Sequence, residues 1–226
     1  MRSLELSLPK VDLKNYLLRQ LNLFFPDGNT VDESFMDSCV DQSVARLELS
    51  FDRIALPYYI KGQYSYFNHL HGDHYSAFLY MTSNTAYKLG NEDIAAKLFL
   101  LNKAMFGIDA FYGIDLPEHF LFVHPLGTVL GRANYSDFLV VYQGVTVGAT
   151  VEGIYPAFSQ RTILYSHSSV IGKCFLGKNF VMGANASIIN TPIPDNTIVI
   201  GSYPNYRTLE NKKNLITKYF QVEDVS

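Results

Sequence analysis

The stretch from Phe158 to Ile188, FSQRTILYSHSSVIGKCFLGKNFVMGANASI, repeats with a period of six residues. A large apolar residue occupies every sixth position: Phe158, Leu164, Val170, Leu176, Met182 and Ile188. Four residues after each of the first five stands a second residue, small in all but one case: Thr162, Ser168, Cys174, Phe180 and Ala186. Neither a helix nor an alternating strand produces this double register. The period therefore predicts a solenoid built from hexapeptides.

A hexapeptide solenoid has a triangular cross-section, in which each six-residue unit forms one side and three units complete a coil. The large residue points into the prism and stacks on its counterpart one coil away, while the small residue fits the corner. One coil cannot bury its apolar positions alone, so the coils must stack into a rod.

Length and composition limit the classes of protein. The 226 residues are enough for one large or two small domains. The formal charge of −3 provides no basic field, which argues against nucleic acid or an anionic membrane as a partner. No apolar run is long enough for a signal peptide or a membrane span, so we expect a cytoplasmic protein. We expect Cys39 and Cys174 to be reduced and structural.

The character of the sequence changes near residue 107. Before it, four segments carry apolar residues at helical spacing, which predicts an α-helical domain over residues 1–107. Asp73 is a candidate cap for the third helix and Asn91 for the fourth. Gly90 and Gly107 are candidates to end these two helices.

Short β segments follow over residues 108–201, and the hexapeptide period breaks between Gly148 and Pro156. Such a break predicts a loop extruded from the solenoid, and loops of this kind often border binding sites. Residues 202–226 form a C-terminal tail, which we expect to be a short helix or an arm.

Several motifs together resemble the serine acetyltransferase branch of the hexapeptide acyltransferases. They are HPLGTVLGRA, YQGVTVGAT, the long repeat from Tyr155 to Ile189, and IPDNTIVIGSYP. The resemblance covers Ile108 to Pro204, and the helical segment before it also fits that family. It implies an α+β chain, with an N-terminal α-helical domain followed by a left-handed parallel β-helix. It also implies a homotrimer or hexamer that transfers an acetyl group from acetyl-CoA, with no metal.

The resemblance implies roles for individual residues. His124 corresponds to the general base of the family, and Asp109, fifteen residues earlier, corresponds to its carboxylate partner. A neutral imidazole is suited to take the proton of an alcohol as that alcohol attacks a thioester, without a covalent intermediate. Backbone N–H groups at Gly148 and Ala149 would polarise the thioester oxygen, and Ser166 would contact the pantetheine arm in a groove between copies.

The sequence departs from the family where serine would be held. Val123 replaces an acidic residue, and Ile154 and Tyr155 replace an arginine and a histidine. An amino-acid acceptor would lose both charged anchors, each worth about 1–3 kcal/mol. We therefore expect acetylation of a sugar hydroxyl, as in polysaccharide biosynthesis, with Tyr155 lining the acceptor site. A sugar amine or serine itself is the alternative acceptor.

A cluster of three histidines and one aspartate, His69, His71, Asp73 and His74, lies at the start of the third predicted helix. Its spacing matches no zinc motif well. The alternatives are exposed histidines on a capped helix, recognition of the acceptor by Asp73 or His74, and a metal site. His167 is either a surface residue or a contact across the groove between copies.

Two other classes of protein remain as alternatives. His119 and His124 have the spacing of a zinc-binding pair in gamma-class carbonic anhydrases, but no histidine between His74 and His119 supplies the third ligand. A non-catalytic scaffold is the other alternative, because repeat folds are common binding surfaces. The interrupted coil and the Asp109 and His124 pair argue against it.

Overall fold

The hexapeptide positions face the interior of a stack of β-coils, as predicted. In the computed structural model, which describes residues 1–29 and 31–222, the six large residues from Phe158 to Ile188 are 0–3 % exposed. The five residues of the second phase are 0–1 % exposed. Both sets of side chains are therefore buried inside the solenoid. Each large apolar side chain contributes about 1.5–3 kcal/mol to the free energy of folding through its burial.

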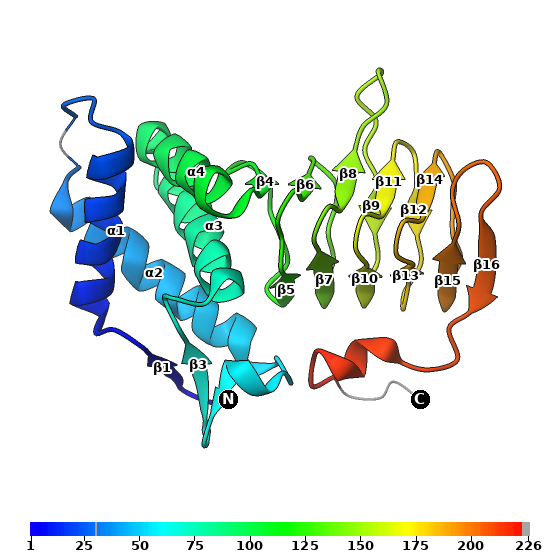
Figure 1. Ribbon diagram of the computed structural model, residues 1–226, viewed down its shortest axis with the longest axis horizontal. Coiled ribbons are helices and arrows are strands. Elements are labelled where there is room, and N and C mark those ends of the chain that lie inside the picture. The colour runs from blue at the N-terminus through cyan, green and yellow to red at the C-terminus, as the bar shows by residue number, and fades with distance from the viewer. Residues whose placement is uncertain (30, 223–226) are drawn as a thin grey trace.

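The coils of the solenoid are stacked along the long axis of the molecule (Figure 1), and their strands form three faces. One face is a six-stranded sheet of β5 (Phe120–Val123), β7 (Leu139–Tyr142), β10 (Thr162–Leu164), β13 (Val181–Met182), β15 (Thr197–Ile200) and β16 (Arg207–Glu210). The second is a five-stranded sheet of β4 (Asp109–Ala110), β6 (Val129–Leu130), β8 (Thr146–Gly148), β11 (Ser169–Ile171) and β14 (Ser187–Ile189). The third contains β9 (Ala157–Phe158) and β12 (Phe175–Leu176). All pairings are parallel except that of β15 with β16.

The N-terminal region is helical, as predicted, with a small sheet that the sequence analysis did not predict. Its helices are α1 (Lys10–Phe24), α2 (Glu33–Asp52), η1 (Pro57–Tyr59, a 3-10 turn), α3 (Gly72–Lys88) and α4 (Glu92–Phe106). Its strands are β1 (Leu4–Leu6), β2 (Ile60–Lys61) and β3 (Tyr64–Phe67). The Asn91 side chain caps α4 by accepting the Ile94 N–H, and Gly107 ends α4 in the left-handed region at φ +64°.

Asp73 is not the cap of α3, contrary to the prediction. The helix begins two residues earlier than predicted, at Gly72, with His71 at the cap position and Asp73 in the first turn. The Asp73 carboxylate instead points across to the solenoid, where it accepts a hydrogen bond from the backbone of His124. A hydrogen bond to the solenoid thus takes the place of the predicted cap at the start of α3.

Helix α3 attaches the helical region to the solenoid. The Tyr80 hydroxyl donates to the carbonyl of Ile114 and accepts the N–H of Leu116, while Asn84 donates to the carbonyls of Tyr112 and Ile114. These bonds fix the chain that leads into β5, and α3 is buried from Asp73 to Ala86. The N-terminus of α3 is thereby held beside the end of β5.

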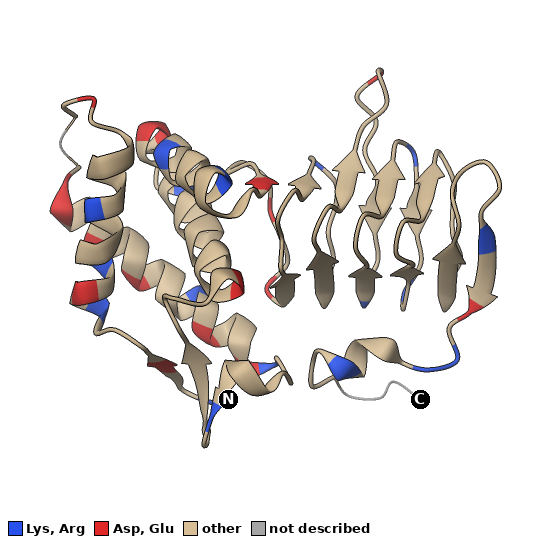
Figure 2. Ribbon diagram, viewed as in Figure 1, with Lys and Arg blue, Asp and Glu red and all other residues tan. Residues whose placement is uncertain are grey.

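The tail turns back along the solenoid after β16. It contains a 3-10 turn, η2 (Leu215–Lys218), and an isolated β-bridge joins Phe220 to Ile54 beyond α2. Figure 2 shows that charged side chains lie mainly on the helical region and the tail, while the solenoid strands carry few. None of the helices in the described part of the chain is both long and apolar enough to cross a bilayer.

Candidate active site

His124 stands on a bulge at the corner of the first complete coil. Six residues lie between Phe122 and Val129, whereas four lie between their partners in the next coil, Val141 and Thr146. The two extra residues leave the coil register, and His124 adopts φ +48°. Its side chain is 78 % exposed. The bulge therefore projects the imidazole out of the solenoid wall.

Asp73 holds the backbone of this bulge from the helical region. Its Oδ1 accepts the His124 N–H at 2.9 Å and lies 3.9 Å from His124 Nδ1. The residue is 4 % exposed, and its Oδ2 is buried with no hydrogen-bond partner among the described residues. Burial raises the pKa of the Asp73 carboxyl, opposed by the hydrogen bond from His124. An unpaired buried oxygen of this kind is suited to a donor group of a ligand.

Asp109 does not pair with His124 in the structure. Its carboxylate lies 2.7 Å from Lys103 Nζ, in a partly exposed ion pair at the start of the solenoid. Among the described residues, Asp73 is the one whose carboxylate lies within 4.0 Å of a ring nitrogen of His124. The carboxylate fifteen residues before His124, that of Asp109, lies on a neighbouring side of the coil. The carboxylate near the His124 ring is that of Asp73, from the helical region.

His71 and His74 flank Asp73 at the start of α3. Their rings stack at 4.2 Å, and the His71 ring also stacks on Tyr58 at 5.2 Å. His74 is fully buried, and its Nδ1 accepts the Asn68 N–H. Burial lowers the pKa of His74 to about 3, so this ring is neutral at pH 7. The structure thus places His74 in the buried interior beside the start of α3, and its contact with the acceptor stays a prediction.

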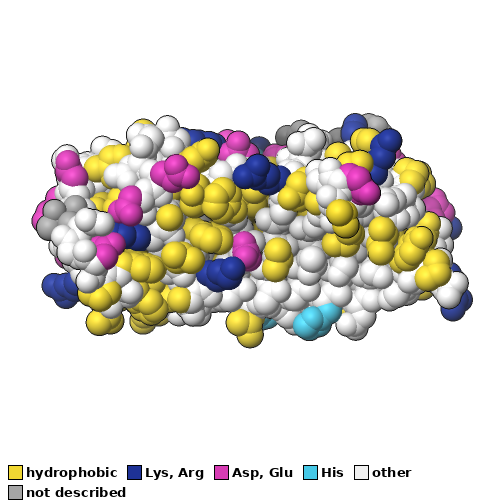
Figure 3. All heavy atoms as spheres, turned by 90° about the horizontal axis from the view of Figure 1, so that it is seen from above, with side chains coloured by type: hydrophobic (Ala, Val, Ile, Leu, Met, Phe, Trp, Pro, Cys, Tyr) yellow, Lys and Arg dark blue, Asp and Glu magenta, His cyan; other side chains and the backbone are white. Residues whose placement is uncertain are grey.

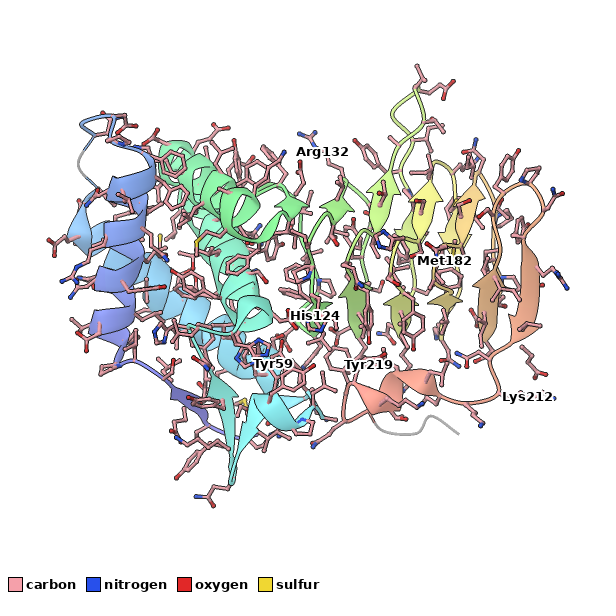
Figure 4. All side chains as sticks on the ribbon, in the orientation of Figure 1. Tyr59, His124, Arg132, Met182, Lys212 and Tyr219 are labelled. Carbon is pink, nitrogen blue, oxygen red and sulfur yellow. The ribbon has the colours of Figure 1, made fainter. Side chains whose placement is uncertain are left out.

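Three tyrosines complete this side of the junction. Tyr142 follows Val141 at the end of β7, and Tyr165 takes the same position one coil further on. The hydroxyls of Tyr142 and Tyr219 lie 2.8 Å apart, and those of Tyr219 and Tyr165 lie 3.2 Å apart. Figure 4 shows His124, Tyr59 and Tyr219 on the same side of the junction, with Arg132 on the opposite side.

The residues predicted to contact acetyl-CoA lie elsewhere on the solenoid. Gly148 ends β8 in the five-stranded sheet, and Ala149 begins the extruded loop. Ser166 follows Tyr165 at the corner after β10. Tyr155 closes the loop and is 37 % exposed, with its ring against Gly131. None of these forms a hydrogen bond with His124 within the described residues, so their roles stay predictions for a groove between copies.

The remaining histidines have structural surroundings. His69 Nδ1 lies 2.8 Å from the Ser7 hydroxyl, and His119 accepts or donates at 2.8 Å with Asp137 while stacking on Phe138. The His167 ring lies over Gly144 in the preceding coil. Over residues 1–29 and 31–222, no three His, Cys, Asp or Glu side chains are grouped to hold a metal ion.

Sequence reasoning missed the tyrosines. Tyr142 and Tyr165 lie 23 residues apart at equivalent positions of two successive coils. Once the register of the repeat is known, the sequence therefore predicts that they are neighbours. Tyr219 lies in the tail, outside any repeat, and nothing in its local sequence places it beside β7 and β10.

Comparison with known proteins gives one consistent likeness. No family model matches the chain. A serine acetyltransferase of Synechococcus elongatus is 27 % identical over 105 residues, 45 % of this chain and 43 % of that protein. One from Mycobacterium tuberculosis is 30 % identical over 99 residues, 42 % of this chain and 43 % of that protein. The matches thus span less than half the length of these curated relatives.

Solved structures extend the likeness to most of the chain. A serine acetyltransferase of Vibrio cholerae has a TM-score of 0.69 at 15 % identity, covering 90 % of this chain and 80 % of that one. A Brucella abortus serine acetyltransferase in complex with coenzyme A has a TM-score of 0.66 at 16 % identity, covering 90 % and 83 %. At such identities the likeness establishes the fold, a helical N-terminal region followed by a left-handed parallel β-helix, as predicted.

Proposed function

We propose that the chain is an acetyltransferase that moves the acetyl group of acetyl-CoA to a hydroxyl group, with His124 as general base. The observation that carries the proposal is the bulge, which exposes an imidazole at a junction of two domains while a buried carboxylate fixes its backbone. A purely structural coil would not need the two extra residues.

In this reaction the neutral imidazole of His124 takes the proton of the acceptor hydroxyl as its oxygen attacks the thioester carbon. The C–S bond breaks when the tetrahedral adduct collapses, and the imidazolium returns the proton to the thiolate of CoA. The Asp73 charge, 3.9 Å from His124 Nδ1, favours the imidazolium while it exists, because opposite charges attract. Gly148, Ala149 and Ser166 would contact acetyl-CoA in the groove between copies.

The side chains around His124 favour a sugar as acceptor. Val123, the residue before His124, bears no charge, and Tyr142 pairs with it across the sheet. Ile154 and Tyr155, on the extruded loop, also bear no charge. Among the described residues, no lysine side chain forms a hydrogen bond or ion pair with His124, Asp73 or the three tyrosines. A serine carboxylate would have no lysine partner there, whereas Asp73 suits a hydroxyl or the ammonium of an amino sugar.

Serine is the second candidate acceptor, and the comparisons favour it. The relatives and the solved structures described above are serine acetyltransferases, and none is described as acting on a sugar. The ammonium of serine would also find a partner in Asp73. Serine differs from a neutral sugar in carrying a carboxylate, which also needs a partner in the site.

Release of CoA thiol from acetyl-CoA tests both candidates. The purified protein is assayed with L-serine, glucosamine, N-acetylglucosamine, galactose, nucleotide sugars and oligosaccharides. Turnover with a sugar and none with serine supports the main proposal. Turnover with serine supports the second candidate, and silence across the panel together with no acetyl-CoA binding by calorimetry would contradict acetyl transfer altogether.

A further inference from the structure

The C-terminal segment Asn211–Val222, called here the strap, runs back from the far end of the solenoid to the helical region (Figure 1). Asn211 anchors its start, since its side-chain amide donates to the carbonyl and to Oδ1 of Asn179, both at 3.0 Å. At its other end the Tyr219 carbonyl accepts the Ala55 N–H at 2.8 Å, and Gln221 donates to the Arg53 carbonyl at 2.7 Å. The strap is thus fixed to both domains.

Burial shows that the strap is a packed element. Ile216 is 0 % exposed and Phe220 is 1 % exposed, and the Phe220 ring meets the edge of Phe138 at 5.5 Å. Val140 and Ile163 neighbour inward-facing residues and so point to the outer face of the sheet, yet both are at most 1 % exposed. The apolar side of the strap covers this face.

The strap delivers the Tyr219 hydroxyl to the neighbourhood of His124. Tyr219 meets Tyr142, which pairs across the sheet with Val123, the residue just before His124. The backbone of His124 in turn donates to Asp73 Oδ1 at 2.9 Å. The strap therefore borders the site formed by His124 and Asp73.

The three hydroxyls leave hydrogen-bonding capacity for a ligand. Tyr142, Tyr219 and Tyr165 carry one hydroxyl hydrogen each, and the two bonds among them use two of the three. Whichever way the bonds run, one hydrogen and several lone pairs remain. Tyr142 and Tyr165 are only partly buried, so a ligand can reach them. A neutral molecule with adjacent hydroxyls both donates and accepts, and it matches this set.

We infer that the strap forms one wall of the acceptor site and that Tyr219 is a specificity-determining residue, which favours a neutral polyhydroxylated acceptor over an amino acid. The inference rests on the proposed function. Tyr219 orients the hydroxyls of Tyr142 and Tyr165, and these two hydroxyls bind the acceptor. Tyr219 is therefore a positioning residue that controls how tightly the acceptor binds.

The test compares Tyr219→Phe with the wild-type protein, because phenylalanine keeps the packed ring and removes only the hydroxyl. We expect the KM for the sugar acceptor to rise about 3- to 10-fold, with the KM for acetyl-CoA unchanged. Tyr203→Phe is the matched control, since Tyr203 is 50 % exposed at the far end of the solenoid. It should leave every constant as in the wild type.

A binding measurement separates this inference from the proposed function. Galactose, N-acetylglucosamine and L-serine are titrated into both proteins and followed by saturation-transfer NMR, which needs no turnover. Weaker sugar binding by Tyr219→Phe supports the strap as a wall of the site even if the wild type transfers no acetyl group. Equal sugar binding by the two proteins, or an equal loss for serine and sugar, would overturn it.

Discussion

His124 is exposed because two residues exceed the coil register, and its function can be tested without removing the bulge. Asparagine tolerates the left-handed backbone of position 124 better than alanine, so His124→Asn is the cleaner variant. We expect kcat to fall by roughly 10²–10⁴ because the general base is gone. Calorimetry should show nearly unchanged acetyl-CoA binding. Full turnover, or loss of cofactor binding, would mean that His124 is not the base.

Asp73 and Asp109 can be distinguished by parallel alanine variants. Asp73→Ala removes the acceptor of the His124 N–H, a bond to a charged group that contributes about 1.5–3 kcal/mol, so kcat/KM should fall roughly 10- to 100-fold. Asp109→Ala breaks a partly exposed pair with Lys103, worth about 0.2–1 kcal/mol, and should change the rate by less than about 5-fold. The reverse order in steady-state kinetics would restore Asp109 as the partner of the base.

The raised pKa of Asp73 also predicts a pH dependence of stability. Its folded-state pKa lies above the unfolded value because burial penalises the charge, so the folded state loses stability as the pH rises through this window. Asp73→Asn removes that penalty and keeps an oxygen for the His124 N–H. Urea unfolding should find the variant more stable than the wild type at pH 7, with the difference vanishing below pH 3.8. A variant less stable at pH 7 would contradict this assignment.

At the scale of the elements, the coils depend on close backbone approach at their corners. A Cβ on Gly177 would lie 2.4 Å from the Asp195 nitrogen in the next coil, although Gly177 does not have a positive φ. A Cβ on Gly153, at φ +75° in the extruded loop, would meet nothing within 4 Å. We expect Gly177→Ala to cost about 3 kcal/mol by overpacking and Gly153→Ala about 1 kcal/mol by backbone strain. Equal costs in denaturant titrations would argue against tight stacking of the coils.

The elements also show what the sequence could predict. The hexapeptide register, the α4 cap at Asn91 and the end at Gly107 follow from local patterns, and the structure confirms all three. The first residues of the chain and the tail form strands by pairing with distant partners: β1 with β3, and β16 with β15. Such pairings depend on tertiary contacts more than on local preference.

The part of the candidate site that lies on the repeat was predictable from the sequence. The part that depends on contact between the two domains was not. The position of His124 follows from its motif, but its partner Asp73 is 51 residues away on another domain. Asp73 was predicted as an acceptor contact, and the structure adds the hydrogen bond to the His124 backbone. Local sequence contains no information about which helix start will lie against which coil corner, so the count from the motif selected Asp109.

At the scale of the whole molecule, one side of the solenoid remains open. A groove of about 540 Å³ lies along the side of β9 and β12, lined by ten residues that include Phe158, Phe175 and Ile193. Phe175 is 57 % exposed. Seen from above, hydrophobic side chains gather over the solenoid end between isolated charged ones (Figure 3). Exposed apolar surface of this kind commonly marks an interface.

We therefore expect this side to pack against another copy, giving the trimer or hexamer that the family resemblance implies. Light scattering should give a mass of three or six times 25.5 kDa. Phe175→Glu buries a charge in the interface, so the assembly should dissociate at micromolar concentration and acetyl-CoA binding should weaken with it. Phe24→Glu is the matched control, since Phe24 is 46 % exposed on the helical region. It should keep at least the trimer, and a fall from hexamer to trimer would assign the helical region to the second interface. A wild-type monomer, or a Phe175→Glu assembly as stable as the wild type, would show that the groove does not join copies of this chain.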